Sequence, residues 1–407
     1  MLNSRFRFGL LMAASLMVFL SGSGCARGPD FDDHLREVTA PYRFDVSRWE
    51  FGAFLRELGR LGRGTPGSTG NATAVVAEYF ENAARVGRLE ARAEAIAAGG
   101  TPGDLSAVEK ELAELRERNA AMAAAVERQL EGQIREALSG QGIFNPIGGK
   151  IPFPPVNFHL GMPPHLLVIS PRDRIESIRR VTLLPGMTRE DMESIEAEID
   201  RHGVSSLVVD LGGLATYPSY VTDAADLRFV LDTAHEEWLH QYLAFTPLGF
   251  LYLLDLAGIR PDYEIATMNE TLASMVSKEL GGLIYEQYYN GDRETPGEGT
   301  PPSGFDFNRE MREIRRTVDG YLARGEIEPA ERFMEMKRQY LATRGYHLRK
   351  LNQAYFAFHG TYADSPTSIS PIGVEMKQLR SGSDSLRDFL DTVSVMTSRQ
   401  DLAESLR

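Results

Sequence analysis

The sequence predicts an α+β protein that is predominantly helical, with a helical hairpin lobe followed by a second domain that contains a small sheet. Most of the 407 residues lie in segments whose apolar residues recur at three- and four-residue steps, as in amphipathic helices. Short apolar runs bounded by turn residues are grouped between residues 165 and 211, as expected for strands. The 43% hydrophobic and 25% charged content is ordinary for a globular chain, so a chain of this length can bury a large core.

The N-terminus has the pattern of a bacterial export signal. Two arginines precede an uncharged run over residues 8–20, and small residues then lead to Cys25, the only cysteine in the chain. A lone cysteine after small residues is typical of a lipobox, where it would be diacylated, although Gly22 stands where leucine is expected. An uncleaved N-terminal anchor is the alternative. In both cases we expect residues 1–25 to direct the chain out of the cytoplasm and to hold it at the cell membrane, as a lipoprotein in the first case.

The charge and the cysteine content limit the partners and the means of stabilisation. The formal net charge is −13 at pH 7. A protein that binds nucleic acid or anionic lipid needs a basic patch, so this charge argues against both kinds of partner. A single cysteine excludes an intramolecular disulfide, so the fold must be stable through its core. Neither observation indicates an oligomeric state.

The first part of the exported chain is predicted to be helical. Residues 26–43 are polar and mixed, and we interpret them as a tether to an N-terminal lobe at residues 44–150. Breaks rich in glycine and proline divide this lobe into predicted helices at residues 44–61, 72–98 and 104–138. Asp104 is the expected N-cap of the last helix, whose apolar residues follow a coiled-coil pattern with Asn119 at one core position. The short break before it favours an antiparallel hairpin, and a homo-oligomeric coiled coil is the alternative.

The second domain, residues 151–407, starts with a connector rich in glycine and proline and then alternates strands with helices. We predict strands at residues 165–170, 175–184 and 205–211, and an amphipathic helix at residues 188–202. Residues 290–304 have the composition of a surface loop. Later helices are expected at residues 307–323, 329–358 and 383–393.

Residues 223–245 are predicted to form the helix that carries the chemistry. Its apolar residues form one stripe, and Asp223 is a candidate N-cap. Roughly opposite the stripe lie Glu236 and His240, one turn apart and flanked by apolar side chains instead of Lys or Arg. A carboxylate and an imidazole in such surroundings are costly unless something satisfies them, and a metal ion is a common solution. The sequence therefore indicates a metal site on this helix.

The segment HEEWLH at residues 235–240 nearly matches the zinc-peptidase motif H-E-x-x-H, with one residue too many between the histidines. Positions five apart on a regular helix diverge by about 140°, so both histidines cannot reach one ion there. Two arrangements with a metal remain open, and a helix that holds no metal is the third possibility. A bulged helix would use His235 and His240 as ligands and Glu236 as base. A regular helix would use Glu236 and His240 as ligands and Glu237 as base, and we favour it because it needs no distortion.

A second predicted helix, residues 265–280, supplies the next candidate ligand. Glu270 lies on a side of this helix that also carries alanine and serine residues, whose small side chains let a neighbouring helix approach closely. A carboxylate on such a face is well placed to reach an ion held by Glu236 and His240. A solvated helix position is the alternative interpretation of Glu270.

Together these two helices resemble the gluzincin metallopeptidases, whose third metal ligand is a glutamate in a downstream N-E helix. Residues 233–390 resemble more specifically the bacterial predicted-aminopeptidase family, whose members are often lipid-anchored. The counterparts of its H-E-L-A-H-Q, F-N-E-S-F-A, R-L-N-N-A and T-Y segments are EEWLHQ at 236–241, MNETLA at 268–273, KLNQA at 350–354 and Thr361-Tyr362. The resemblance favours the regular helix. The chain departs from the family at the first ligand, where Glu236 replaces histidine, and its N-terminal lobe is not covered.

The resemblance implies a gluzincin-like domain that hydrolyses peptide bonds, with aminopeptidase activity as one option. Zinc, or another divalent transition metal, would be held by His240, Glu270 and either Glu236 or His235, and would lower the pKa of a bound water toward about 7. Glu237, or Glu236 in the bulged helix, would take the proton of that water.

Further residues are assigned to the substrate and to the developing oxyanion. Three side chains could donate a hydrogen bond to the oxyanion: Tyr362, Tyr355 or His359. The glycine-rich segment after the last strand is expected to be an edge strand that pairs with a peptide backbone, with an ordinary loop as the alternative. This candidate substrate-binding wall consists of Gly213, Leu214 and Ala215, and Asn352 is a further candidate. The competing function is a catalytically inactive lipoprotein that keeps the fold and acts as a binding or scaffold module.

Overall fold

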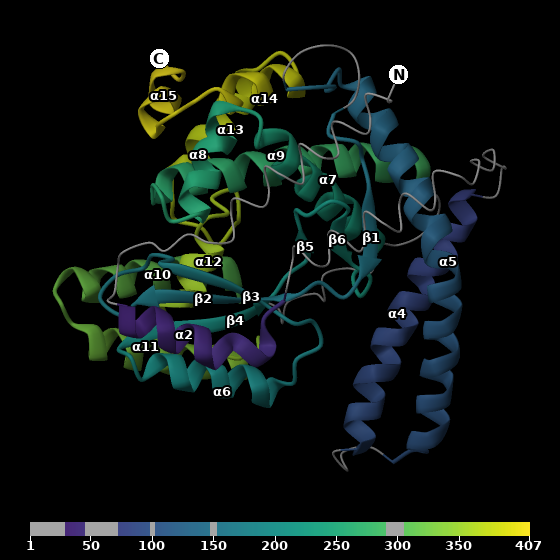
Figure 1. Cartoon of the computed structure of the whole chain (residues 1–407), viewed down its shortest axis with the longest axis horizontal. Helices are drawn as coiled ribbons and strands as arrows, with labels where there is room; N and C mark the ends of the chain where they lie inside the picture. The colour runs from purple at the N-terminus through teal and green to yellow at the C-terminus, as the bar shows by residue number, and fades with distance from the viewer. Residues whose placement is uncertain (1–28, 45–71, 98–101, 147–152, 290–304) are drawn as a thin grey trace.

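The structure, a computed structural model, describes residues 29–44, 72–97, 102–146, 153–289 and 305–407. These residues form mostly helices with two small three-stranded sheets, which confirms the predominantly helical α+β class (Figure 1). Among the described helices, none is both long enough and apolar enough to cross a membrane. The predicted signal with Cys25, the loop at residues 290–304 and, apart from Phe44, the helix at residues 44–61 lie outside the described residues.

Helices α4 (Ala72–Ala97) and α5 (Leu105–Gly140) form an antiparallel hairpin that projects as a long arm in Figure 1. Asp104 caps α5 by accepting a hydrogen bond from a backbone N–H at 3.2 Å, as predicted. The Asn119 side chain donates to the Tyr79 carbonyl oxygen of α4 at 3.2 Å, so the amide nitrogen of the polar seam residue has its partner within the hairpin. The predicted intramolecular hairpin is therefore confirmed.

The boundary that we predicted at residue 150 does not separate two packing units. Only the far half of the hairpin has a small core of its own, formed by Leu89, Val108, Leu112 and Leu115. Nearer its C-terminal end, α5 buries aliphatic side chains in the main core, against helices of the second predicted domain. The coiled-coil pattern continues through both halves, so nothing in it marks where the packing partner changes.

The first sheet is antiparallel and has the strand order β3-β2-β4. β2 (His165–Pro171) lies between β3 (Arg179–Leu183) and β4 (Val204–Asp210). These are the three predicted strands, with the start of the second shifted by four residues, from the predicted residue 175 to Arg179.

One face of this sheet is covered by α6 (Arg189–Asp200) and by α2 (Pro29–Thr39). Phe31 and Leu35 of α2 are buried in the core between them, with Val38 partly buried beside them. The structure therefore corrects the expected tether, since this segment is a packed helix, followed by the 3-10 helix η2 (Ala40–Tyr42). The three apolar residues have helical spacing, but the acidic residues around them concealed the stripe.

The other face of the sheet is covered by α12 (Gln353–His359), behind which α10 (Phe307–Ala323) and α11 (Ile327–Thr343) pack together. We predicted one helix at residues 329–358, and the structure divides it in two. Gly345 adopts a φ of 88°, a conformation that favours glycine and ends helices.

The second sheet has the strand order β1-β6-β5 and lies beside the helical core. β1 (Phe158–Gly161), which falls within the predicted connector, pairs in parallel with β6 (Ser219–Thr222). β5 (Gly213–Leu214) pairs antiparallel with β6 and forms one edge of the sheet. The glycine-rich segment therefore has the edge position that we predicted for it.

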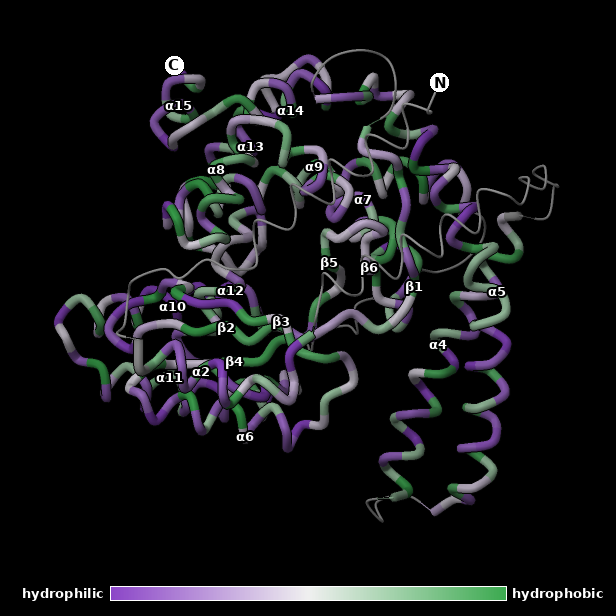
Figure 2. Tube along the Cα trace, in the orientation of Figure 1, coloured by the Kyte–Doolittle hydropathy of each residue, from purple (hydrophilic) through white to green (hydrophobic). Residues whose placement is uncertain are grey.

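The largest core is built from α7 (Leu227–Leu243), α8 (Pro247–Leu256) and α9 (Tyr263–Tyr289). The C-terminal helices pack onto it: α13 (Pro371–Gly382), α14 (Leu386–Ser394) and α15 (Arg399–Glu404). Figure 2 shows hydrophobic residues along β2 and β4 and around α8, whereas the arm and α6 are mixed. Helices α7 and α9, which bring the candidate metal ligands, are thus held by the main core.

Helices α7 and α9 approach each other closely at Gly281. A Cβ at this position would overlap Asp232 Oδ1 and would lie 3.1 Å from Asp232 N. Gly281→Ala should therefore lower the free energy of unfolding by about 1–3 kcal/mol, as is typical of over-packing. Gly87→Ala in α4 is the matched control, because a Cβ there meets nothing within 4 Å. The control should raise the free energy of unfolding by about 0.5–1 kcal/mol. Denaturant unfolding measures both, and equal midpoints would contradict the prediction.

Candidate metal centre

Helix α7 positions the residues that we predicted to bind a metal. It begins after Asp226, whose side chain accepts a hydrogen bond from the Phe229 N–H at 2.9 Å. The N-cap is therefore Asp226. Our prediction of Asp223 was wrong. The helix is α-helical throughout, without a bulge. A regular helix keeps residues four apart on one side, which the favoured arrangement of ligands requires.

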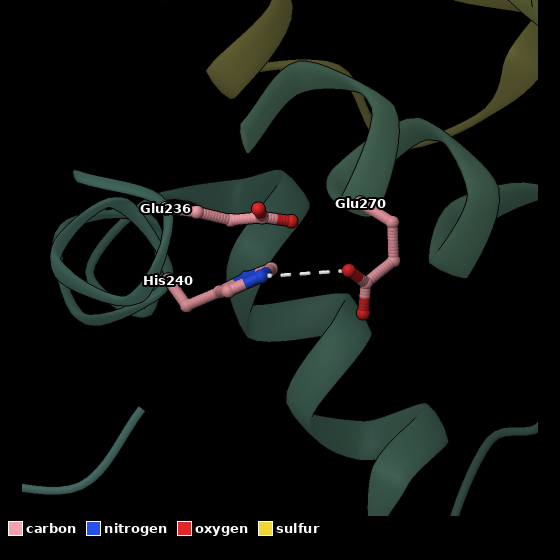
Figure 3. A group of neighbouring side chains, drawn as sticks. All are labelled: Glu236, His240 and Glu270. Atoms are coloured by element: carbon pink, nitrogen blue, oxygen red, sulfur yellow. Dashed lines mark ion pairs between the residues drawn. The ribbon is translucent and has the colours of Figure 1, made fainter. Parts of the chain in front are cut away.

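Glu236 and His240 of α7 face Glu270 of α9, as Figure 3 shows. One potential ligand atom from each residue lies within 4.8 Å of the others, and the described part of the chain holds no other such group. His240 Nε2 and Glu270 Oε2 are 3.5 Å apart, and these side chains are 13% and 9% exposed. The structure thus brings together the ligands of the regular-helix arrangement, with side chains that are largely buried.

His235 takes no part in this cluster. Its side chain is fully buried, and its Nδ1 atom lies 2.7 Å from the Leu231 carbonyl oxygen. Burial lowers the pKa of His235 to about 4, so the imidazole is neutral at pH 7. The bulged arrangement, with His235 as ligand and Glu236 as base, therefore does not match this structure.

The acidic side chains and the histidine of this site shift one another's pKa values. Burial raises the pKa of Glu236 to about 7 and that of Glu237 to about 8. Burial alone would lower the pKa of His240, but the carboxylates of Glu270, Glu237 and Glu236 raise it to about 10. Burial would also raise the pKa of Glu270, yet His240 and its other neighbours hold it at about 2. Protonated His240 and ionised Glu270 therefore form an ion pair in this structure.

A divalent cation fits this set of donors. Glu236 Oε1 and Glu270 Oε2 are buried, and neither accepts a hydrogen bond from the described residues. With His240 they offer one imidazole nitrogen and two carboxylates, which Zn²⁺ and other divalent transition metals accept as ligands. Three protein ligands also leave a coordination position for water or substrate. The cluster can therefore hold a metal ion, and a bound cation would replace the His240 proton as counter-charge.

Two neighbouring residues orient the candidate ligands. Asn269 Oδ1 lies 3.1 Å from His240 Nδ1, so the other ring nitrogen is directed at Glu270. Tyr252 of α8 donates its hydroxyl to Glu270 Oε1. Outer partners of this kind fix the orientation and the tautomer of metal ligands. We had quoted Asn269 only as part of a motif and had missed Tyr252, because nothing in the apolar segment of α8 marks one tyrosine as a polar partner.

Comparisons with protein-family models, curated proteins and solved structures found no match for this chain. The geometry of the site is therefore the basis for assigning a function. The resemblance to the gluzincins stays a proposal.

Glu237, the predicted base, lies against the edge strand β5. A Cβ on Gly213 would be 2.5 Å from Glu237 Oε1, so the strand backbone approaches this carboxylate closely. The Gln241 side chain donates to the Thr216 carbonyl oxygen at 2.6 Å and to Ser219 Oγ at 2.8 Å, which ties the loop after β5 to α7. The predicted wall residues all lie in this segment: Gly213 and Leu214 in β5, and Ala215 directly after it.

Tyr362 is the predicted oxyanion donor that lies near the cluster. Burial raises the pKa of its hydroxyl, and the carboxylates of Glu270, Glu236 and Glu237 raise it further. The phenol is therefore protonated at neutral pH and can donate a hydrogen bond.

The remaining candidates lie elsewhere. Asn352 is the N-cap of α12, and its amide nitrogen donates to the Ser206 carbonyl oxygen at 2.9 Å. Because Asn352 is buried and both ends of its amide are occupied, its predicted role in substrate binding is corrected to a structural one. Tyr355 and His359 line a cavity of about 280 Å³ whose lining does not include the cluster.

Proposed function

We propose that this chain is a membrane-tethered, extracytoplasmic peptidase with a gluzincin-like domain that uses zinc or another divalent transition metal. The observation that carries the proposal is the convergence of Glu236, His240 and Glu270, with the further carboxylate of Glu237 on the same helix. The resemblance of the surrounding segments supports peptide hydrolysis. Lipid attachment at Cys25 is part of the proposal and concerns residues outside the described structure.

Glu237 is the base in this proposal. Bound at the three ligands, a divalent ion would polarise a scissile carbonyl group and lower the pKa of water. A nearby dication also favours the ionised form of the Glu237 carboxylate, whose pKa burial otherwise raises to about 8. Glu237 would take the proton of the attacking water and deliver it to the leaving amine, as a general base and then a general acid.

The edge strand and Tyr362 supply the other parts that the reaction needs. An extended peptide can add to the edge of a sheet through its backbone hydrogen bonds, and β5 offers such an edge beside Glu237. The hydroxyl of Tyr362 would donate to the oxyanion that forms as the carbonyl is attacked. These assignments make the substrate an extended peptide and do not choose between terminal and internal cleavage.

Gly213→Ala should separate the edge strand from Glu237. The new methyl group would displace the carboxylate, and a misplacement of about 1 Å can cost roughly 100-fold in rate. We expect kcat/KM for a peptide to fall by that order, with metal content unchanged by elemental analysis. Gly161→Ala in β1 of the same sheet is the matched control, because the nearest atom to its Cβ would be 3.6 Å away. Equal loss in both variants would contradict a specific role for Gly213.

The direct test of the proposed function uses the full chain loaded with zinc and a peptide library read by mass spectrometry. We expect cleavage that stops when a chelator removes the metal and returns when zinc is restored. Stoichiometric zinc without cleavage of any peptide would reject the peptidase and favour a binding or scaffold module.

A further inference from the structure

We propose that the outer side of α8 lies in the membrane interface, so that the metal centre acts on peptide segments at the membrane surface. The inference rests on the membrane tether and the metal site of the proposed function, and it adds a contact surface and a substrate class to them. Three apolar residues form this surface, which we call the outer ridge: Phe250, Leu254 and Ile259.

The outer ridge is continuous because of the way in which α8 ends. Phe250 and Leu254 are one turn apart, so they lie on the same side of the helix. Gly258 adopts a φ of 66°, and the Ile259 N–H donates to the Leu254 carbonyl oxygen at 3.0 Å. The Gly258 N–H donates to the Asp255 carbonyl oxygen at 2.9 Å, which completes a Schellman motif. This motif places Ile259 beside the last turn of α8, so it extends the side that carries Phe250 and Leu254.

The outer ridge is apolar and open to its surroundings. Phe250 is 55% exposed, Ile259 is 65% exposed, and Leu254 is partly exposed. None of the three belongs to an apolar core of the described residues. The only charged side chain of α8, Asp255, accepts a hydrogen bond from a backbone N–H at 2.8 Å. The exposed Arg260 directly follows the ridge, where a guanidinium can reach lipid phosphates. A row of exposed apolar side chains marks a contact surface, unlike single ones.

The short chain before α2 indicates that a membrane covers the outer ridge. Three residues, 26–28, separate Cys25, the proposed site of lipid attachment, from Pro29, where α2 begins. An extended chain spans at most about 3.6 Å per residue, so the start of α2 must stay within roughly 15 Å of the lipid. The tether therefore holds the body of the protein against the membrane instead of at a distance from it.

Helix α2 transmits this constraint to the rest of the molecule. Arg179 of β3 donates to both carboxylate oxygens of Asp32, at 3.0 and 3.1 Å, and Phe31 and Leu35 are buried against the first sheet. Figure 1 shows α2 and α8 on the same half of the molecule, with the arm projecting from the other half. One membrane surface can therefore hold the start of α2 and contact the outer ridge, with the arm on the side away from it.

The opposite side of α8 contacts the metal centre. Tyr252 follows Phe250 by two residues, so their side chains point about 200° apart around the helix. The Tyr252 hydroxyl donates to Glu270 Oε1. One helix, about 10–12 Å across with its side chains, therefore separates a candidate metal ligand from the membrane interface. Peptide segments at the surface of the bilayer are the substrates that this placement favours.

The experiment places nitroxide labels on introduced cysteines, in the full chain reconstituted into phosphatidylcholine vesicles. Cys25 is the only natural cysteine, and the unsubstituted chain measures any label on it. Labels at Phe250→Cys and Ile259→Cys should collide mainly with oxygen, which concentrates in lipid, and lose access to a water-soluble nickel complex. Ala113→Cys, at an exposed position of the arm, is the matched control and should keep that access. The vesicles carry no net charge, because the net charge of −13 argues against anionic lipid.

Each outcome has a separate meaning. Equal access of the nickel complex to the ridge and arm labels would overturn this inference alone. Low collision rates with both reagents would show that protein covers the ridge, either a second copy or another part of this chain, and would also overturn it. A full chain that does not bind vesicles would overturn the inference and the tether, but peptide cleavage by that chain would retain the peptidase. If Phe250→Cys does not fold, Ile259→Cys decides, because this residue lies beyond the end of α8.

Discussion

His240→Ala should remove the metal from the purified full chain. The imidazole is the only nitrogen ligand of the cluster, and without it Glu236 and Glu270 would have to hold the ion alone. We expect the affinity for zinc to fall by more than the 10- to 100-fold that is typical of losing an outer partner. Elemental analysis after dialysis should give near-stoichiometric metal for the wild type and none for the variant.

His235→Gln is the matched control for this experiment, because it changes the neighbouring histidine of the same motif. His235 is buried and contacts the Leu231 carbonyl oxygen, to which a glutamine can also donate. The control should therefore keep its metal, at some cost in stability. Loss of metal from His235→Gln as well as from His240→Ala would restore the bulged arrangement. A metal-free wild type of ordinary stability would favour the inactive lipoprotein.

The part of the site that lies on α7 and α9 could be predicted because helical periodicity is local information. Glu236 and His240 are one turn apart whatever the rest of the chain does, and a regular helix excludes His235 from their side. Glu270 could be predicted for a related reason, since the small residues beside it indicate close helix packing. The structure brings these side chains together as that reasoning expected.

The residues that we missed depend on contacts between distant segments. Tyr252 reaches Glu270 from α8, and no spacing in the sequence reports such a contact. Asn352 shows the opposite error. A polar residue in a suggestive motif was taken for a substrate contact, but its amide is used in capping α12 and in binding the Ser206 carbonyl oxygen. Residue type alone does not show whether hydrogen-bonding capacity is already occupied.

The fold was predicted best in segments where the apolar residues recur with a single period, that of a helix or that of a strand. The hairpin of α4 and α5 and the three strands of the first sheet have clear patterns, and they are present. The segment of α2 was misread because its apolar stripe is short and lies among charges, and only the sheet beneath it reveals which side is buried. The strand β1 escaped prediction because its partner β6 is distant in sequence and the segment itself is only four residues long.

Glu237→Gln should stop peptide hydrolysis and leave the metal in place. Glutamine keeps the size of the side chain but cannot accept a proton, and a general acid–base residue typically contributes 10²- to 10⁴-fold to the rate. We expect kcat to fall by a factor in that range. Metal content should stay stoichiometric, because Glu237 is not one of the three clustered ligands. Elemental analysis and steady-state kinetics on the same preparation measure the two quantities together.

Glu236→Gln is the matched control, since it makes the same change one residue earlier on α7. A neutral amide oxygen is a weaker ligand than a carboxylate, so this variant should lose metal affinity, and excess zinc should restore much of its activity. The two neighbouring glutamates would then be separated by function, one as ligand and one as base. The reverse pattern, with metal lost from Glu237→Gln and retained in Glu236→Gln, would assign the base to Glu236. Because a regular helix directs these side chains about 100° apart, that pattern would also require a distorted α7 in solution.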